Sequence, residues 1–126
     1  MSDNGSGARR VLIVEDDVMI RMLIEDMLGD LGFTVAAEAS KVHEALAAVN
    51  SIAFDVAILD VNLSGETTGP VAEALAARGT PFVFATGYGE HGLPGQFRDR
   101  PLLKKPFQIE SLKRVLEVAL AGARAV

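Results

Sequence analysis

Short apolar runs of strand length alternate with segments of helical periodicity, and this alternation constrains the fold more than any other feature of the chain. The runs contain β-branched residues, and four or five apolar positions in succession are typical of strands buried on both faces. Such strands separated by helices predict a parallel sheet with helices on both faces. The predicted strands cover residues 11–14, 33–37, 56–59, 81–85 and, more weakly, 102–103.

Four other segments place apolar residues at the three- and four-residue spacing of an amphipathic helix. Boundary signals agree with them: Asp17 can cap the first helix, and Gly32 follows it. Ser40 can cap the second helix, Pro70 suits the first turn of the third, and Gly122 is expected to close the last. The predicted helices cover residues 18–28, 42–49, 71–77 and 109–120.

The alternation fails between the fourth and fifth strands, where a covering helix is expected. Residues 86–100 read TGYGEHGLPGQFRDR and contain four glycines and one proline. Inside a helix, glycine costs about 1 kcal/mol and proline about 3 kcal/mol relative to alanine. Leu93 and Phe97 supply too little apolar surface to offset that cost, so we expect this helix to be short, mobile or missing.

The length of 126 residues predicts one domain, which we place at residues 9–122, with a flexible leader at 1–8 and a tail at 123–126. No apolar run reaches the roughly 20 residues of a membrane span, and the first residues lack the apolar centre of a secretory signal. We therefore expect a cytoplasmic protein without membrane contact. The chain has no cysteine, so neither a disulfide framework nor a thiolate metal site is expected.

The charge balance argues against nucleic acid as a partner. The net charge is −5, and the basic residues are scattered rather than massed. Affinity for nucleic acid comes mainly from Lys and Arg side chains that neutralise phosphates. We therefore expect no nucleic-acid partner.

Acidic residues stand directly after two of the predicted strands. In an open parallel sheet, ligands bind beyond the carboxyl ends of the strands, and for the assumed order 2-1-3-4-5 the site lies between strands 1 and 3. Glu15, Asp16 and Asp60 are expected to converge there, and their oxygens suit a hard cation such as Mg²⁺. Thr86 ends the fourth strand and Lys105 follows the fifth, so a hydroxyl and an ammonium group join the same edge.

Each of these residues also has a simpler interpretation. An acid after a strand is usually a solvated turn residue or a helix N-cap, and Asp17 is expected to be such a cap. Thr86 can start a turn, and Lys105 can be an ordinary surface cation. Short motifs taken singly give many false positives. The combination of acids after strands 1 and 3, a hydroxyl after strand 4 and Lys-Pro after strand 5 favours a site that handles phosphate.

Four motifs carry a resemblance to a known family: VLIVEDD at residues 11–17, AILDVNLSG at 57–65, FATGYGE at 84–90 and LLKKPF at 102–107. In order and spacing the chain resembles the receiver domain of a two-component response regulator over residues 11–120. The resemblance implies a flavodoxin-like (βα)5 fold, a doubly wound parallel sheet with strand order 2-1-3-4-5. It also implies a signalling phosphoacceptor that catalyses its own phosphorylation and dephosphorylation, rather than a conventional enzyme.

The resemblance implies a role for each matching residue. Asp60 would accept a phosphoryl group from a histidine kinase in a Mg²⁺-dependent reaction, Thr86 would contact the group, and Lys105 would pair with it. The Lys105–Pro106 bond is typically cis in relatives. The implied metal ligands are Glu15, Asp16, Asp60 and, through its backbone carbonyl, Asn62.

The FATGYGE motif resembles a narrower group of receivers, the FATGUY subfamily, whose members are often stand-alone and partnered with kinases of the HWE or a related class. One position departs from ordinary receivers. Leu102 stands where most relatives carry an aromatic residue that moves with the activated threonine. We therefore expect phosphorylation to order or reposition the glycine-rich segment, residues 87–100, instead.

Several functions stay open at this point. The module could signal to an unknown downstream protein, act as a phosphate sink, or pass the phosphoryl group on as a phosphorelay intermediate. A pseudo-receiver that binds partners without phosphate is one rival. The other is a phosphatase of the haloacid dehalogenase type, which needs a second acid two residues after its nucleophile, where this chain has Asn62.

Overall fold

The computed structural model describes residues 8–86 and 100–124. Five parallel strands form one sheet in the order β2-β1-β3-β6-β7. Because β6 and β7 are the fourth and fifth strands of this sheet, the predicted order 2-1-3-4-5 is confirmed, and with it the flavodoxin-like α/β fold. The strands are β1 (Arg10–Val14), β2 (Thr34–Ala39), β3 (Val56–Asp60), β6 (Phe82–Thr86) and β7 (Leu102–Lys104).

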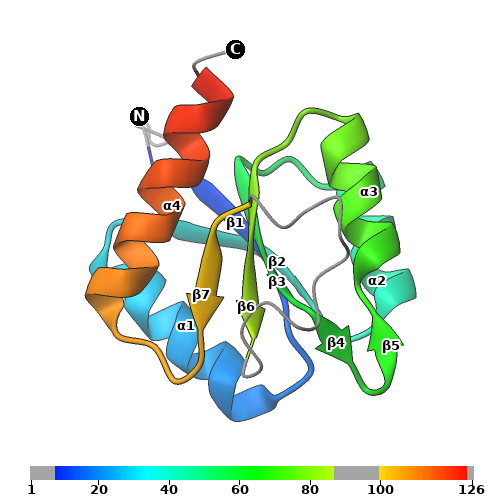
Figure 1. The fold of residues 1–126 in the computed structure, drawn as a ribbon, viewed down its shortest axis with the longest axis horizontal. Helices are drawn as coiled ribbons and strands as arrows, with labels where there is room; N and C mark the ends of the chain where they lie inside the picture. The colour runs from blue at the N-terminus through cyan, green and yellow to red at the C-terminus, as the bar shows by residue number, and fades with distance from the viewer. Residues whose placement is uncertain (1–7, 87–99, 125–126) are drawn as a thin grey trace.

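Helices cover both faces of the sheet, with α1 and α4 on one side and α2 and α3 on the other (Figure 1). Alternate residues of each strand therefore enter different cores. In β1, Leu12 and Val14 pack toward α2 and α3, whereas Val11 and Ile13 pack toward α1 and α4. The helices are α1 (Val18–Asp30), α2 (Val42–Ser51), α3 (Gly69–Ala77) and α4 (Ile109–Arg124).

The helix ends match the predictions only in part. The Asp17 carboxylate caps α1 by accepting hydrogen bonds from two backbone N–H groups, and Gly32 follows the helix with φ of 87°. The prediction for Ser40 is wrong, because Lys41 is the N-cap residue of α2 and Ser40 instead donates to the Glu44 carboxylate. The prediction for Gly122 is also wrong: α4 continues to Arg124, and its buried apolar stripe offsets the cost of one glycine.

A small antiparallel hairpin follows the third strand of the sheet, in a segment for which no strand or helix was predicted. It consists of β4 (Asn62–Leu63) and β5 (Glu66–Thr67). Ser64 and Gly65 form the connection with φ of 49° and 91°, the positive values that two-residue hairpin turns of this hand require. Leu63 is buried and attaches the hairpin to the core. The hairpin therefore stands at the carboxyl edge of the sheet (Figure 1).

Some predictions concern residues outside the described ones. The short, mobile or missing helix and the proposed movement of the glycine-rich segment fall almost wholly on residues 87–99, and the leader falls almost wholly on residues 1–7. The domain limits 9–122 stay a prediction. In the described part of the chain, no helix combines the length and the apolar character needed to cross a membrane.

Candidate functional site

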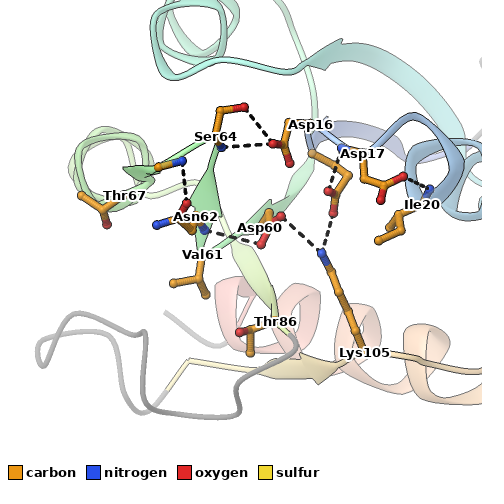
Figure 2. A pocket seen from close by; sticks show the side chains of 12 residues that line it. Asp16, Asp17, Ile20, Asp60, Val61, Asn62, Ser64, Thr67, Thr86 and Lys105 are labelled. Carbon is orange, nitrogen blue, oxygen red and sulfur yellow. Dashed lines mark hydrogen bonds and ion pairs between the residues drawn. The ribbon is translucent and has the colours of Figure 1, made fainter.

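Three carboxylates from distant parts of the sequence converge at the carboxyl end of the sheet. Glu15 and Asp16 follow β1, Asp60 ends β3, and these strands are neighbours, with Val14 paired to Leu59. One carboxylate oxygen from each acid lies within 4.8 Å of those of the other two. Figure 2 shows the side chains around the pocket at this edge. The sequence predicted this convergence from the strand order.

Glu15 is held from several directions. Its side chain is only 2% exposed, its backbone N–H donates to the Ala39 carbonyl, and its carboxylate accepts a hydrogen bond from the Asp17 N–H. The Arg21 guanidinium donates to the Glu15 carbonyl at 2.9 Å and pairs with Glu38 of β2 at 3.0 Å. Arg21 thus links α1, the β1–α1 loop and β2, a contact that the sequence reasoning missed.

Lys105 provides the cation of the site. Its Nζ lies 2.8 Å from Glu15 Oε1 and 3.2 Å from Asp60 Oδ2, so one ammonium group bridges two carboxylates (Figure 2). The lysine follows β7, and its backbone N–H donates to the Thr86 carbonyl at 2.8 Å. The bond from Lys105 to Pro106 is cis. The predicted proximity of strand 5 to the acids is therefore observed.

Burial and nearby charges shift the pKa values of Glu15 and Lys105. Burial raises the pKa of Glu15, and the charge of Asp60 raises it further, while the hydrogen bond from Lys105 opposes the shift. For Lys105, burial lowers the pKa, but the hydrogen bond to Glu15 and the charge of Asp60 outweigh burial and raise it overall. Lys105 therefore stays protonated at neutral pH. One ammonium faces three carboxylates, and that excess of negative charge favours a further cation.

The hairpin supplies more contacts to the acids. The backbone N–H and the hydroxyl of Ser64 both donate to Asp16 Oδ2, at 3.0 and 2.9 Å. The Asn62 N–H donates to Asp60 Oδ1 at 3.4 Å, and the Asn62 side-chain oxygen accepts from the Gly65 N–H at 2.9 Å. Sequence reasoning selected Asn62 but missed Ser64. The Ser-Gly pair before β5 was the available signal, because it is typical of a two-residue turn.

Thr86 is the last residue of β6 and lies at the same edge of the sheet, where it lines the pocket. It is 1% exposed and pairs in register with Lys104 of β7, next to the lysine of the site. A pocket of about 640 Å³ opens between these elements. All the residues that the sequence selected line it: Glu15, Asp16, Asp60, Asn62, Thr86 and Lys105.

The donor set fits Mg²⁺ on chemical grounds. Mg²⁺ prefers oxygen ligands and is commonly held by one or two carboxylates together with water and phosphate oxygens. Among the residues that the structure describes, the pocket lining contains no histidine or cysteine, the ligands that favour zinc. Glu15, Asp16 and Asp60 therefore form a suitable site for a hard divalent cation beside Lys105.

Most of the chain matches a known protein family. Residues 11–117 match the family described as response regulator receiver domain. The transcriptional regulatory protein PdtaR of Mycobacterium tuberculosis is 32% identical over 122 residues, which is 94% of this chain and 60% of PdtaR. The chain therefore spans less than two thirds of that relative. A probable chemotaxis protein CheY of Rhizobium etli is 29% identical, with 90% of this chain and 93% of that protein covered.

Solved structures agree with the sequence relatives. The solution structure of SdrG from Sphingomonas melonis Fr1 is 47% identical with a TM-score of 0.83, and covers 91% of this chain and 98% of SdrG. The receiver domain of the Erythrobacter litoralis PhyR response regulator is 30% identical with a TM-score of 0.82, and 94% of each chain is covered. Both similarities extend over nearly the whole described fold.

Proposed function

This chain belongs to the response regulator receiver domain family, and from that premise we propose that it accepts a phosphoryl group from a histidine kinase on Asp60 in a Mg²⁺-dependent reaction. One observation carries the proposal. The Lys105 ammonium lies within 3.2 Å of Asp60 Oδ2, inside a cluster of three carboxylates at the carboxyl end of the sheet. This arrangement joins a nucleophile, a cation and a metal-binding set in one pocket.

Asp60 is the proposed nucleophile because its carboxylate lies in the pocket and is positioned by two donors. The Asn62 N–H and the Lys105 ammonium each contact one of its oxygens. In the proposed step, an Asp60 oxygen forms a bond to phosphorus while the P–N bond to the kinase histidine breaks. The imidazole nitrogen leaves with the electron pair of that bond, and Asp60 becomes an acyl phosphate.

The remaining residues neutralise charge and fix geometry. Glu15, Asp16, Asp60 and the Asn62 backbone carbonyl are the proposed metal ligands. Bound Mg²⁺ would supply the positive charge that offsets the nucleophile and the incoming phosphoryl oxygens. The Lys105 ammonium pairs with a phosphoryl oxygen, and the Thr86 hydroxyl contacts the same group. These are proposals that rest on the family match and on the position of each residue around the pocket.

The proposed output is a change in protein contacts. An unknown downstream protein, onward relay of the phosphoryl group and a phosphate-sink role are all compatible with the site. From the FATGYGE motif at residues 84–90 we also propose membership of the FATGUY subfamily and a kinase of the HWE or a related class. A cytoplasmic location is proposed with these assignments.

Two rivals from other classes predict different chemistry. A haloacid dehalogenase-type phosphatase needs a general acid two residues after the nucleophile, but here the Asn62 side-chain oxygen accepts a hydrogen bond within the hairpin turn. A pseudo-receiver would bind partners without phosphorylation. That rival gives no reason for a lysine to bridge a buried glutamate and the predicted acceptor.

Mass measurement of the intact protein tests the proposal. The chain is incubated with Mg²⁺ and a small-molecule phosphodonor, and we expect one added phosphoryl mass that survives acid. Asp60→Asn should lose the adduct completely and keep the fold. Asp55→Asn is the matched control, because Asp55 lies before the other end of β3 and accepts from the Arg10 N–H at 2.7 Å. Absence of an adduct in the wild type, or an adduct that persists in Asp60→Asn, overturns the proposal.

A further inference from the structure

The hairpin turn contacts the predicted cation site, and the described function assigns it no role. We infer that Ser64 is a positioning residue that holds Asp16 in place for cation binding, an inference that rests on the proposed Mg²⁺ site. Ser64 lies 48 positions from Asp16 in the sequence. Their contact is therefore a product of the fold rather than of local chain geometry.

Both donors of Ser64 converge on a single oxygen of Asp16. The hydroxyl donates to Oδ2 at 2.9 Å, and the backbone N–H donates to the same atom at 3.0 Å. Dashed lines mark both bonds in Figure 2. Hydrogen bonds to an ionised acceptor are stronger than neutral ones. Among the described residues, no hydrogen bond is formed with Oδ1 of Asp16. One oxygen is thus held by the hairpin, and the other is left for a cation.

Support from hydrogen bonds matters for Asp16 because its side chain is not enclosed in the core. It is half-buried and lies between the end of β1 and Asp17, the N-cap residue of α1. A carboxylate at such a position has several accessible rotamers, and holding it in one of them costs conformational entropy when the cation binds. Two hydrogen bonds made before binding reduce that cost.

The hairpin can position Asp16 because the turn itself is fixed. Ser64 and Gly65 both have positive φ, the Gly65 N–H is bonded to the Asn62 side chain, and Leu63 is 1% exposed in the core. The hairpin also follows Asp60 along the chain after only one residue. Ser64 therefore connects an acid of β1 to the segment that carries the proposed acceptor.

A Mg²⁺ titration of the full-length chain tests this inference. The protein is first freed of metal with EDTA, and binding is followed by backbone amide NMR shifts. Ser64→Gly removes the hydroxyl, keeps the backbone N–H and tolerates the positive φ. We expect Mg²⁺ to bind about tenfold more weakly to this variant, at the low end of losses for residues that orient metal ligands. Ser64→Ala should give the same loss, because it also lacks the hydroxyl without the added flexibility of glycine.

Ser51→Ala is the matched control. Its hydroxyl is exposed and donates to the Ala47 carbonyl at 2.7 Å in α2, so the same kind of bond is lost outside the pocket. This variant should bind Mg²⁺ as the wild type does. Stability in EDTA, measured for all three serine variants, separates a loss of positioning from a loss of folding.

A double-mutant cycle shows whether Ser64 acts through Asp16. In the Asp16→Asn background, Ser64→Gly should have no further effect on Mg²⁺ affinity. Equal affinity of the wild type and Ser64→Gly overturns the inference alone, and so does an undiminished effect of Ser64→Gly in the Asp16→Asn background. A wild type that binds no Mg²⁺ overturns the inference and the proposed function together.

Discussion

Along β3 the chain changes character between two adjacent residues. Leu59 is fully buried among apolar side chains from both neighbouring strands, whereas Asp60 lies in the pocket beside Glu15 and Lys105. Burial of Leu59 stabilises the fold, because apolar surface contributes about 25 cal/mol per Å² removed from water. Burial of ionised Glu15 has the opposite sign, because a desolvated carboxylate is costly unless a cation compensates it.

One strand thus serves two purposes. Its interior contributes to stability, and its carboxyl end holds charges that lower stability when they are left uncompensated. The same division exists in β1, where Val11 to Val14 are 0% exposed and the next residue is Glu15. A substitution in the interior of the strand should therefore change stability through lost apolar packing. A substitution at the carboxyl end of the sheet should change the charge balance of the pocket, and with it both stability and chemistry.

The largest effect on stability is expected in the interior. Leu59→Ala should lower the free energy of unfolding by about 2–5 kcal/mol, because it removes buried methyl groups and leaves a cavity. Urea unfolding followed by circular dichroism measures this change. Leu23→Ala makes the same substitution at a side chain that is 44% exposed on α1. If both variants lose the same free energy, the interior of β3 does not have the role assigned to it.

A smaller loss of stability is expected when the Lys105 ammonium at the carboxyl end of the sheet is removed. Lys105→Met in EDTA should lower the free energy of unfolding by about 2 kcal/mol. That is less than the roughly 3–5 kcal/mol typical of a broken, fully buried pair, because the Lys105 side chain is 18% exposed. Lys104→Met changes the exposed neighbouring lysine and should be nearly neutral. Equal losses for the two variants would show that the bridge to Glu15 and Asp60 does not compensate their charge.

The smallest expected effect is a difference between Glu15→Gln and the wild type in how stability depends on pH. Because the pKa of Glu15 is raised by burial, its contribution to stability is greatest below its ordinary value near 4.5 and is lost as pH rises through the raised pKa. Glu15→Gln should therefore gain stability relative to the wild type as pH rises from 4 to about 7, in unfolding curves measured in EDTA.

Glu44→Gln is the control of opposite sign. The backbone N–H and the hydroxyl of Ser40 hydrogen-bond to Glu44 and lower its pKa, so its contribution is present above 4.5 and is lost as pH falls through the lowered pKa. This variant should lose stability relative to the wild type as pH rises. If Glu15→Gln instead loses stability relative to the wild type as pH rises, as Glu44→Gln is expected to do, the burial effect at Glu15 is contradicted.

Much of the fold and part of the site could be predicted from the sequence, for physical reasons. The apolar runs identified all five strands of the sheet because strands buried on both faces need continuous apolar residues. The convergence of Asp16 and Asp60 followed once the order 2-1-3-4-5 was assumed, since that order makes strands 1 and 3 neighbours and parallel strands end at one edge. The cap at Asp17 was also predictable, because it depends only on neighbouring backbone groups.

The missed features depend on contacts between distant residues. The bond from Ser64 to Asp16 exists only because β1 and β3 are adjacent and the hairpin turns back toward them. The pairing of Arg21 with Glu38 similarly requires α1 to pack beside β2. The cap predicted at Ser40 failed because its hydroxyl binds the Glu44 side chain rather than the backbone. Local pattern cannot decide between such partners.

We propose that the carboxylates at the ends of β1 and β3 need a divalent cation to offset their mutual repulsion. Thermal unfolding of the wild type from EDTA to millimolar Mg²⁺ tests it most directly, with Asp16→Asn and Asp55→Asn measured in parallel. Specific binding to the folded state should add about 1.4 kcal/mol once free Mg²⁺ reaches ten times its dissociation constant. The rise should be largely lost in Asp16→Asn and kept in Asp55→Asn. A wild-type melting temperature indifferent to Mg²⁺, or an equal rise in all three proteins, would contradict the account.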